Sequence, residues 1–342
     1  MMVAIFYALA AIALTAYVVL DGFDLGAGLV HLFVARDEDQ RRAVVSAIGP
    51  YWDGNEVWLL ASGGVLFAVF PRVLAVAFSG FYLALFLLVW TLMLRGLSLE
   101  LRGHLVAPLW RSLCDALFAI SSSLLALLFG VALGNLLRGV PTGGDGWFTL
   151  PLFTSFRPRA PVGLLDFYTV LIGIFAMVTL AHHGALFLAW KTAGELNRRA
   201  RSMAKSLFPV TLALLLVVFA VTGLALNLRP AARALPFFVI AVGALVATRP
   251  LAARGHERGA FLASVGFFAG ALFAVAATLF PVMLRSIDGA ADLTAYDAAA
   301  SSYSLASVLT WMPLALVLVA FYFANLFRIY RGKVETGSSG AH

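Results

Sequence analysis

The chain consists of long apolar runs separated by short breaks that carry charged residues, glycine or proline. The runs are long enough to cross a bilayer, for which a helix needs roughly 20 apolar residues. The pattern predicts nine transmembrane helices, or eight if the short seventh run is not a span. The predicted spans are residues 3–34, 44–70, 73–95, 113–137, 162–190, 206–227, 234–248, 260–284 and 305–329.

Composition indicates the fold class. Of the 342 residues, 62% are hydrophobic and 12% are charged, and the mean hydropathy is +0.95. Ordinary soluble domains are about 25% charged, so we predict an all-α polytopic membrane protein. Residues 1–332 are expected to form one membrane-embedded helical domain, followed by a polar C-terminal tail at 333–342. The single cysteine, Cys114, excludes an internal disulfide and a multi-cysteine metal site.

The positive charge of the chain follows a membrane pattern. The formal net charge is +7, but lysine and arginine gather in alternate breaks between the spans. The breaks after the first, third, fifth, seventh and ninth spans are rich in these residues, and the others are poor. The positive-inside rule therefore predicts a cytoplasmic C-terminus and an N-terminus outside. Because topology explains the charge, we expect no nucleic-acid partner.

The first span contains acids at a depth from which a bilayer excludes charge. Asp21 and Asp24 lie three residues apart and share one helix face. Each charge at such a depth costs roughly 2.5–3.5 kcal/mol by insertion scales, so these acids must be hydrated, paired or protonated. Gly22 and Gly26 have a spacing that lets a second helix approach closely. A proton-handling or ion-handling site is predicted here, and the alternative is that the acids only cap or pair at a helix end.

The second span repeats this combination near its middle. Asp53 and Glu56 share a face, Trp52 and Trp58 flank them, and Gly54 weakens the helix between them. We predict that both acids belong to the same proton-handling site. The alternative for the tryptophans is an aromatic belt at the membrane interface, where tryptophan is common.

Titratable residues also occur at the break after the third span. Glu100 and His104 lie four residues apart, and they would suit proton uptake from the cytoplasm because imidazole titrates near neutral pH. The sequence alone favours a solvated loop. Asp115 and Asp166 lie near the starts of the fourth and fifth spans, where helix dipoles favour acids, so both are predicted to be helix caps.

The histidines do not form a metal-binding pattern. His31 ends the first span, and His182 and His183 lie within the fifth. Adjacent helical residues point to different faces, so the pair cannot form a two-histidine ligand set. We therefore predict no metal site in this chain, and we favour packing or hydrogen bonding over an axial haem ligand for each histidine.

The two acidic stretches carry a family resemblance. Residues 21–26 (Asp-Gly-Phe-Asp-Leu-Gly) and 52–58 (Trp-Asp-Gly-Asn-Glu-Val-Trp) closely resemble the signatures of subunit II of the cytochrome bd-type quinol oxidases. Further familial stretches follow in the same order at 77–82, 134–141 and 293–298, so the resemblance covers most of the chain. The short segment between the sixth and eighth spans resembles the cyanide-insensitive branch of the family.

This resemblance implies a complex that oxidises quinol and reduces dioxygen to water. A partner, subunit I, would carry the haems, either haem b with haem d or b-type haem only. The chain itself would supply no usual haem ligand. It would pack against subunit I as a heterodimer in the inner membrane of a prokaryote, support the haem site and provide proton or oxygen access to it.

The resemblance also extends to single residues. Asp21, Asp24 and Asp53 match acids of the family motifs. Trp52 and Trp58 match its tryptophans, and Trp58 corresponds to a position near a proposed oxygen route.

Three positions depart from the family pattern. Glu56 stands where glutamine is common and adds an ionisable group. Glu100 and His104 stand where the family has an aspartate and a lysine at a proposed cytoplasmic uptake site for protons. The resulting hypothesis is a proton pathway that draws on Asp21, Asp24, Asp53, Glu56, Glu100 and His104.

Two other classes of function compete with this one. A proton-coupled transporter would work without a haem partner and usually contains an inverted repeat, and we find no repeat in the sequence. A purely structural scaffold for subunit I would use the acids only for internal pairing. The sequence leaves open whether a small accessory subunit attaches, and whether the aromatic faces hold a structural quinone or lipid.

Overall fold

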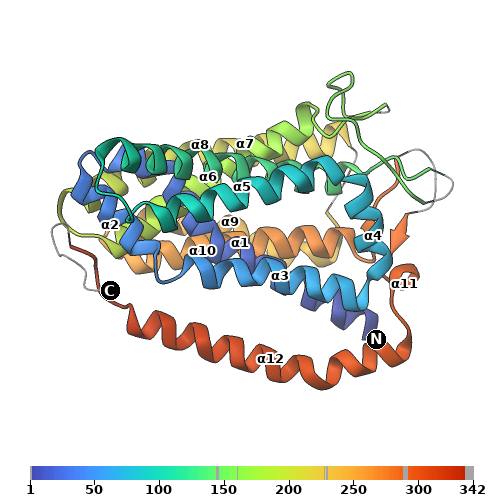
Figure 1. Cartoon of the computed structure of the whole chain (residues 1–342). Coiled ribbons are helices and arrows are strands. Elements are labelled where there is room, and N and C mark those ends of the chain that lie inside the picture. The colour runs from blue at the N-terminus through green and yellow to red at the C-terminus, as the bar shows by residue number, and fades with distance from the viewer. Residues whose placement is uncertain are drawn as a thin grey trace.

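The computed structural model describes residues 2–143, 146–159, 161–226, 228, 230–287 and 292–335, and most of them are helical. The tail residues 336–342 lie outside the described residues. The long helices run alongside one another in one bundle (Figure 1). In chain order the helices are α1 (Met2–Val34), α2 (Glu38–Ile48), α3 (Trp52–Val69), α4 (Pro71–Gly80), α5 (Tyr82–Leu101), α6 (Pro108–Arg138), α7 (Phe167–Lys191), α8 (Gly194–Ala225), η1 (Ala232–Ala234), α9 (Leu235–Ala253), α10 (Glu257–Leu279), α11 (Ala295–Ala298) and α12 (Ser302–Ile329). The short strands β1 (Val282–Leu284) and β2 (Leu293–Thr294) pair antiparallel between α10 and α11.

The predicted fold class is confirmed. Within the described ranges, eight helices are each long and apolar enough to cross a membrane. The pair α3 and α4 passes the same test together, although it bends by 119° at the break between the two helices, and it brings the count to nine. Figure 1 places the two ends of the chain at opposite ends of the bundle, as an odd number of crossings requires.

Several boundaries differ from the predicted spans; the largest shift at a start is in α8, which begins at Gly194 and not at residue 206. Residues 38–48 form the separate helix α2, capped by Asp37, whose side chain accepts from the backbone N–H of Gln40. Pro50 follows α2 and interrupts the run, because proline has no backbone N–H with which to continue the helical hydrogen bonds. Pro71 occupies the first position of α4, so the predicted span 73–95 begins inside a short helix. Its main helix, α5, continues to Leu101.

Helix α1 lies at the centre of the bundle. It packs against α3, α6, α7 and α10. Its closest approach is to α7, where a Cβ added at Gly26 would meet the backbone oxygen of Leu180 at 2.0 Å. The glycine spacing predicted to admit a second helix therefore does so, and it holds the acidic part of α1 in the interior. By contrast, α12 runs along the outside of the bundle (Figure 1).

The two ends of the bundle have different structures. One end, which we call the α2 end, holds α2 and the connections α5–α6, α7–α8 and α9–α10 (Figure 1). At the other end Asp166 caps α7 with a complete capping box, which confirms that part of the capping prediction. Asp166 also pairs with the buried Arg138, which donates to the carbonyl of Gly163 at 3.0 Å and so fastens the long α6–α7 connection.

Candidate functional site

A cluster of charged side chains lies in the interior of the bundle between α1, α3 and α5. Asp21 and Asp24 come from α1, Glu56 from α3 and Arg95 from α5. Asp21, Asp24 and Arg95 are all fully buried, and Glu56 is partly exposed. We call these four residues the buried charge cluster.

Arg95 connects the three helices. Its Nη2 donates to Asp21 Oδ1 and to Glu56 Oε1, both at 2.6 Å. Asp24 does not contact the guanidinium and instead accepts from Asn55 Nδ2 at 2.7 Å. That amide also donates to the carbonyl of Leu20 at 3.1 Å, so α3 is bonded to α1 at two points.

The cluster contains more carboxyl groups than cations. Three carboxyls share one guanidinium, so the cluster is neutral only when two of them carry a proton. Asp21 Oδ2, Asp24 Oδ1 and Arg95 Nε and Nη1 are buried without a hydrogen-bond partner in the described part of the chain. Each unpaired buried group costs about 1–3 kcal/mol, so this arrangement is not the one that stability alone would favour.

Arg95 is the member of the buried charge cluster that the sequence analysis does not single out. The predicted third span ends at residue 95, at a break expected to be cytoplasmic, whereas α5 continues for six further residues. The apolar residues Leu97 and Leu99 after it were the available signal. An arginine inside a membrane-spanning helix pairs with an acid or with backbone carbonyls.

Asp53 is not part of the buried charge cluster. Its side chain is exposed on the outer surface of the chain, while Asn55, two residues later, is fully buried. Asp53 therefore lies on the side of α3 that points away from the rest of the chain. The flanking tryptophans are half-buried, and the ring of Trp58 lies 5.9 Å from that of Phe323 on α12.

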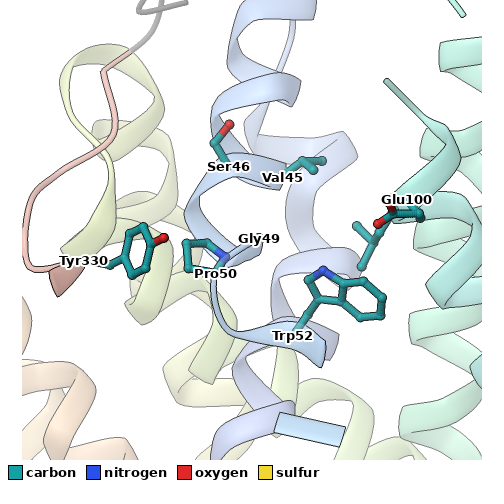
Figure 2. A pocket seen from close by; sticks show the side chains of 8 residues that line it. Val45, Ser46, Gly49, Pro50, Trp52, Glu100 and Tyr330 are labelled. Carbon is teal, nitrogen blue, oxygen red and sulfur yellow. The ribbon is translucent and has the colours of Figure 1, made fainter. Parts of the chain in front are cut away.

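A cavity of about 400 Å³ lies at the α2 end, beside the start of α3. Glu100 and Trp52 line it together with Ser46, Pro50 and Tyr330. Figure 2 shows Glu100 and Trp52 on one side of the cavity, with Tyr330 beyond Pro50 on the other. The cavity thus connects the exposed Glu100 with the first turn of α3, where Asp53 follows Trp52.

His104 stays close to Glu100 but does not line this cavity. Its Nδ1 lies 3.1 Å from the backbone oxygen of Glu100, and its ring is exposed. The solvated loop that the sequence favoured therefore applies to His104, whereas Glu100 is exposed but belongs to the last turn of α5. It does not apply to Arg102 between them, which is buried.

Arg102 belongs to a second ionic network that joins α2, α5 and α6. Its Nε donates to Asp115 Oδ1 at 2.7 Å, and its Nη2 donates to Glu38 Oε2 at 3.0 Å. Burial opposes the charge of Arg102, but its bonds with Asp115 and Glu38 hold the pKa of the guanidinium above its ordinary value. Asp115 is almost fully buried beyond the first turn of α6, so its predicted role as a helix cap is wrong. It holds the loop after α5 against the bundle instead.

Replacing Arg102 with glutamine is expected to lower the free energy of unfolding by about 3 kcal/mol, because Asp115 would remain buried without its closest cation. The measurement is the thermal unfolding midpoint of the purified complex. Arg42→Gln serves as the control, since Arg42 is exposed and lies 3.9 Å from the same Glu38. An equal shift for both variants would contradict the role given to Arg102.

His31 and His183 make hydrogen bonds within the chain, and His182 packs edge-on against Phe208. His183 bonds to the Ser264 hydroxyl at 2.6 Å and to the carbonyl of Val19 at 3.1 Å, so both ring nitrogens are used. The Nδ1 of His31 lies 3.1 Å from the carbonyl of Gly28, and its Nε2 faces Asp115 at 3.7 Å. No group of three or more histidine, cysteine or acidic side chains is arranged to hold a metal ion within the ranges described above. Both ring nitrogens of His183 are already engaged within the chain.

Among the described residues, the eight membrane-spanning helices, or nine with the bent pair, and the buried charge cluster define a polytopic membrane protein with ionisable groups in its interior. A family model described as cytochrome bd terminal oxidase subunit II matches residues 2–330. The chain therefore belongs to this family, and the predicted resemblance is confirmed.

Relatives with curated names agree with the family. The chain is 37% identical over 219 residues to cytochrome bd-I ubiquinol oxidase subunit 2 of Escherichia coli (strain K12). This match covers 64% of the chain and 55% of the relative, so it spans about half of that protein's length. Cytochrome bd ubiquinol oxidase subunit 2 of Bacillus subtilis (strain 168) is 30% identical over 308 residues, which cover 88% of the chain and 87% of the relative.

A solved structure agrees with the fold. The structure of bd oxidase from Geobacillus thermodenitrificans contains a chain that matches with a TM-score of 0.76 at 18% sequence identity. The match covers 96% of this chain and 98% of that one. At this identity the likeness concerns the fold alone.

Proposed function

We propose that this chain is the haem-free subunit of a membrane complex that oxidises quinol and reduces dioxygen to water. The observation that carries this proposal is membership of the family across residues 2–330. The names of the relatives, which are ubiquinol oxidase subunits, support quinol as the electron donor. Family membership also favours an oxidase subunit over a transporter that works alone.

The haems, which would transfer electrons to dioxygen, belong in this proposal to the partner subunit I. The engagement of His183 and His31 in hydrogen bonds within the chain supports this division. We further propose that the α2 end faces the cytoplasm and that the N-terminus lies outside. The excess of lysine and arginine at the α2 end supports this orientation.

The proton route that we propose begins at Glu100 and His104 and ends at Asp53. Glu100 would collect protons at the cavity mouth, and the neighbouring imidazole of His104 would exchange them with the cytoplasm. Water in the cavity would carry them past Trp52 to Asp53, which faces outward from the chain. Protons consumed from the cytoplasm and quinol protons released outside would together build the proton gradient.

The buried charge cluster has a different part in this proposal. Asp21, Asp24 and Glu56 would hold exchangeable protons beside the route, because one guanidinium cannot balance three carboxylates. Glu56 is its partly exposed member and therefore its connection to the surface. Trp58, which packs near α12, is the candidate for the oxygen route implied by the family.

Replacing Asp53 with asparagine is expected to slow quinol-driven oxygen consumption at least about tenfold, because proton transfer by a positioned group contributes roughly 10²–10⁴-fold. The assembled complex should keep its haem content, since Asp53 is exposed in this chain and no ion pair joins it to a described residue. Oxygen uptake per haem is the measurement.

Asp39→Asn provides the matched control, because Asp39 is an exposed acid in the first turn of α2. Unchanged turnover in a fully assembled Asp53→Asn complex would overturn the proton route. Loss of assembly without loss of turnover per haem would instead support the scaffold function.

A further inference from the structure

A second cavity, of about 540 Å³, lies between α7, α8 and α9 at the α2 end. Its wall is strongly basic, with Arg198, Arg201 and Lys205 from α8 and Arg249 from α9. No aspartate or glutamate lines it. We call it the basic cavity. It is separate from the Glu100 cavity and has no part in the proton route.

Most of the positive charge of the basic cavity is not balanced by the protein. Arg198 pairs with Glu195 at 2.6 Å, on the exposed surface of α8. Arg201, Lys205 and Arg249 form no ion pair with any residue that the structure describes. Three exposed cations on two neighbouring helices therefore line one space without a protein counter-charge, and their combined positive potential favours an anion there.

The interior of the cavity combines an apolar surface with a free hydrogen-bonding group. Leu186 and Phe208 line it, and the guanidinium of Arg249 lies 5.7 Å from the centre of the Phe208 ring. His182 lines the cavity at 3% exposure, and its ring nitrogens have no hydrogen bond to a described residue. A buried imidazole that faces a cavity without a protein partner is suited to donate to an acceptor held there.

We propose that the basic cavity binds the headgroup of an anionic phospholipid. Arg201, Lys205 and Arg249 would neutralise its phosphate, and His182 would donate to a phosphate oxygen. The cavity lies where two membrane spans reach the polar end of the bundle, which is the depth of lipid headgroups. Basic pockets between transmembrane helices on the cytoplasmic side have this chemistry.

The surface next to the cavity suits acyl chains. Leu212 on α8 follows the cavity-lining Phe208 by four residues, so it lies on the same helix face, and it is partly exposed. Val246 on α9 precedes Arg249 by three residues and is close to half exposed, at 49%. A free phosphate would leave these apolar faces uncovered, whereas a phospholipid covers the cations and the apolar surface together. The occupant is therefore a lipid.

The test uses the complex purified in mild detergent, with native mass spectrometry of bound lipid. The triple variant R201Q/K205Q/R249Q is compared with R36Q/R42Q/R254Q, which removes the same charge from exposed positions at the α2 end. We expect the wild type and the control to retain one phosphatidylglycerol or cardiolipin more firmly than their other lipids. The triple variant should bind phosphatidylglycerol at least about tenfold more weakly after delipidation.

Adding single ligands to the delipidated wild-type complex tests whether the site binds an anionic lipid, even if the triple variant does not assemble. Phosphatidylglycerol should raise its thermal unfolding midpoint, and neither phosphatidylcholine nor inorganic phosphate should do so at the same concentration. An equal effect of phosphatidylcholine would show that charge plays no part and would overturn the proposal. An equal effect of inorganic phosphate would identify a free-anion site and would overturn the assignment to lipid.

Discussion

Replacing Arg95 with leucine is expected to lower the free energy of unfolding by about 3–5 kcal/mol, which is typical when one partner of a buried ion pair is removed. The variant leaves Asp21 and Glu56 without the guanidinium that each contacts at 2.6 Å. The yield of assembled complex and its thermal unfolding midpoint are the measurements. Both should fall sharply, since α5 loses its only ion pairs to α1 and α3 among the described residues.

The design includes a rescue that separates charge from shape. In the variant R95L/D21N/E56Q the two carboxylates become neutral amides, so much of the lost stability should return. Arg111→Leu is the control, because Arg111 pairs with Glu38 at 3.2 Å near the surface. A triple variant as unstable as R95L would show that the guanidinium acts through packing and not through charge.

Replacing Gly184 with alanine is the second change with a large expected effect. The added Cβ would lie 2.1 Å from the backbone carbon of Gly26 and 2.3 Å from the backbone nitrogen of Ala27, and these backbone atoms cannot move aside as a flexible side chain can. Helices α1 and α7 would have to separate, and we expect a loss of at least about 3 kcal/mol, at the upper end of overpacking costs. Thermal unfolding of the purified complex measures it.

Gly243→Ala is the matched control for this prediction. Gly243 is also a helical glycine in a membrane span, but a Cβ there would meet no atom within 4 Å. Alanine should be neutral or stabilising by up to about 1 kcal/mol, because glycine is the poorer helix former. If the two alanine variants behaved alike, close contact at Gly26 and Gly184 would not be what holds α1 in place.

These two predictions concern the same feature of the molecule. The close approach of α1 and α7 holds the acidic part of α1 in the centre of the bundle. There Arg95 pairs with Asp21 and Glu56, and Asn55 donates to Asp24. A complex that uses proton-binding groups in the interior of the bundle requires both the α1–α7 contact and the ion pairs of Arg95. The proton route proposed through Asp53 lies on the outer side of α3 and would depend on the same helix remaining in position.

The sequence by itself determined the class of protein, the approximate number of spans and the presence of acids inside the membrane. These features are local, because hydropathy over some 20 residues decides whether a segment crosses a bilayer. The short capping interactions are local as well, and the cap at Asp166 was predicted correctly. The family motifs at 21–26 and 52–58 are contiguous in sequence and therefore needed no structure.

Only the tertiary structure decided which of these residues meet. Arg95 and Asp21 are 74 positions apart, and no local pattern pairs them. Asp53 and Asn55 differ by two positions, yet one is exposed and the other buried, because a helix turns by about 100° per residue and its neighbours determine which face is covered. The rotation of each helix depends on the packing of the whole bundle. Which acids lie inside, and which face a partner, is therefore a property of the assembled fold.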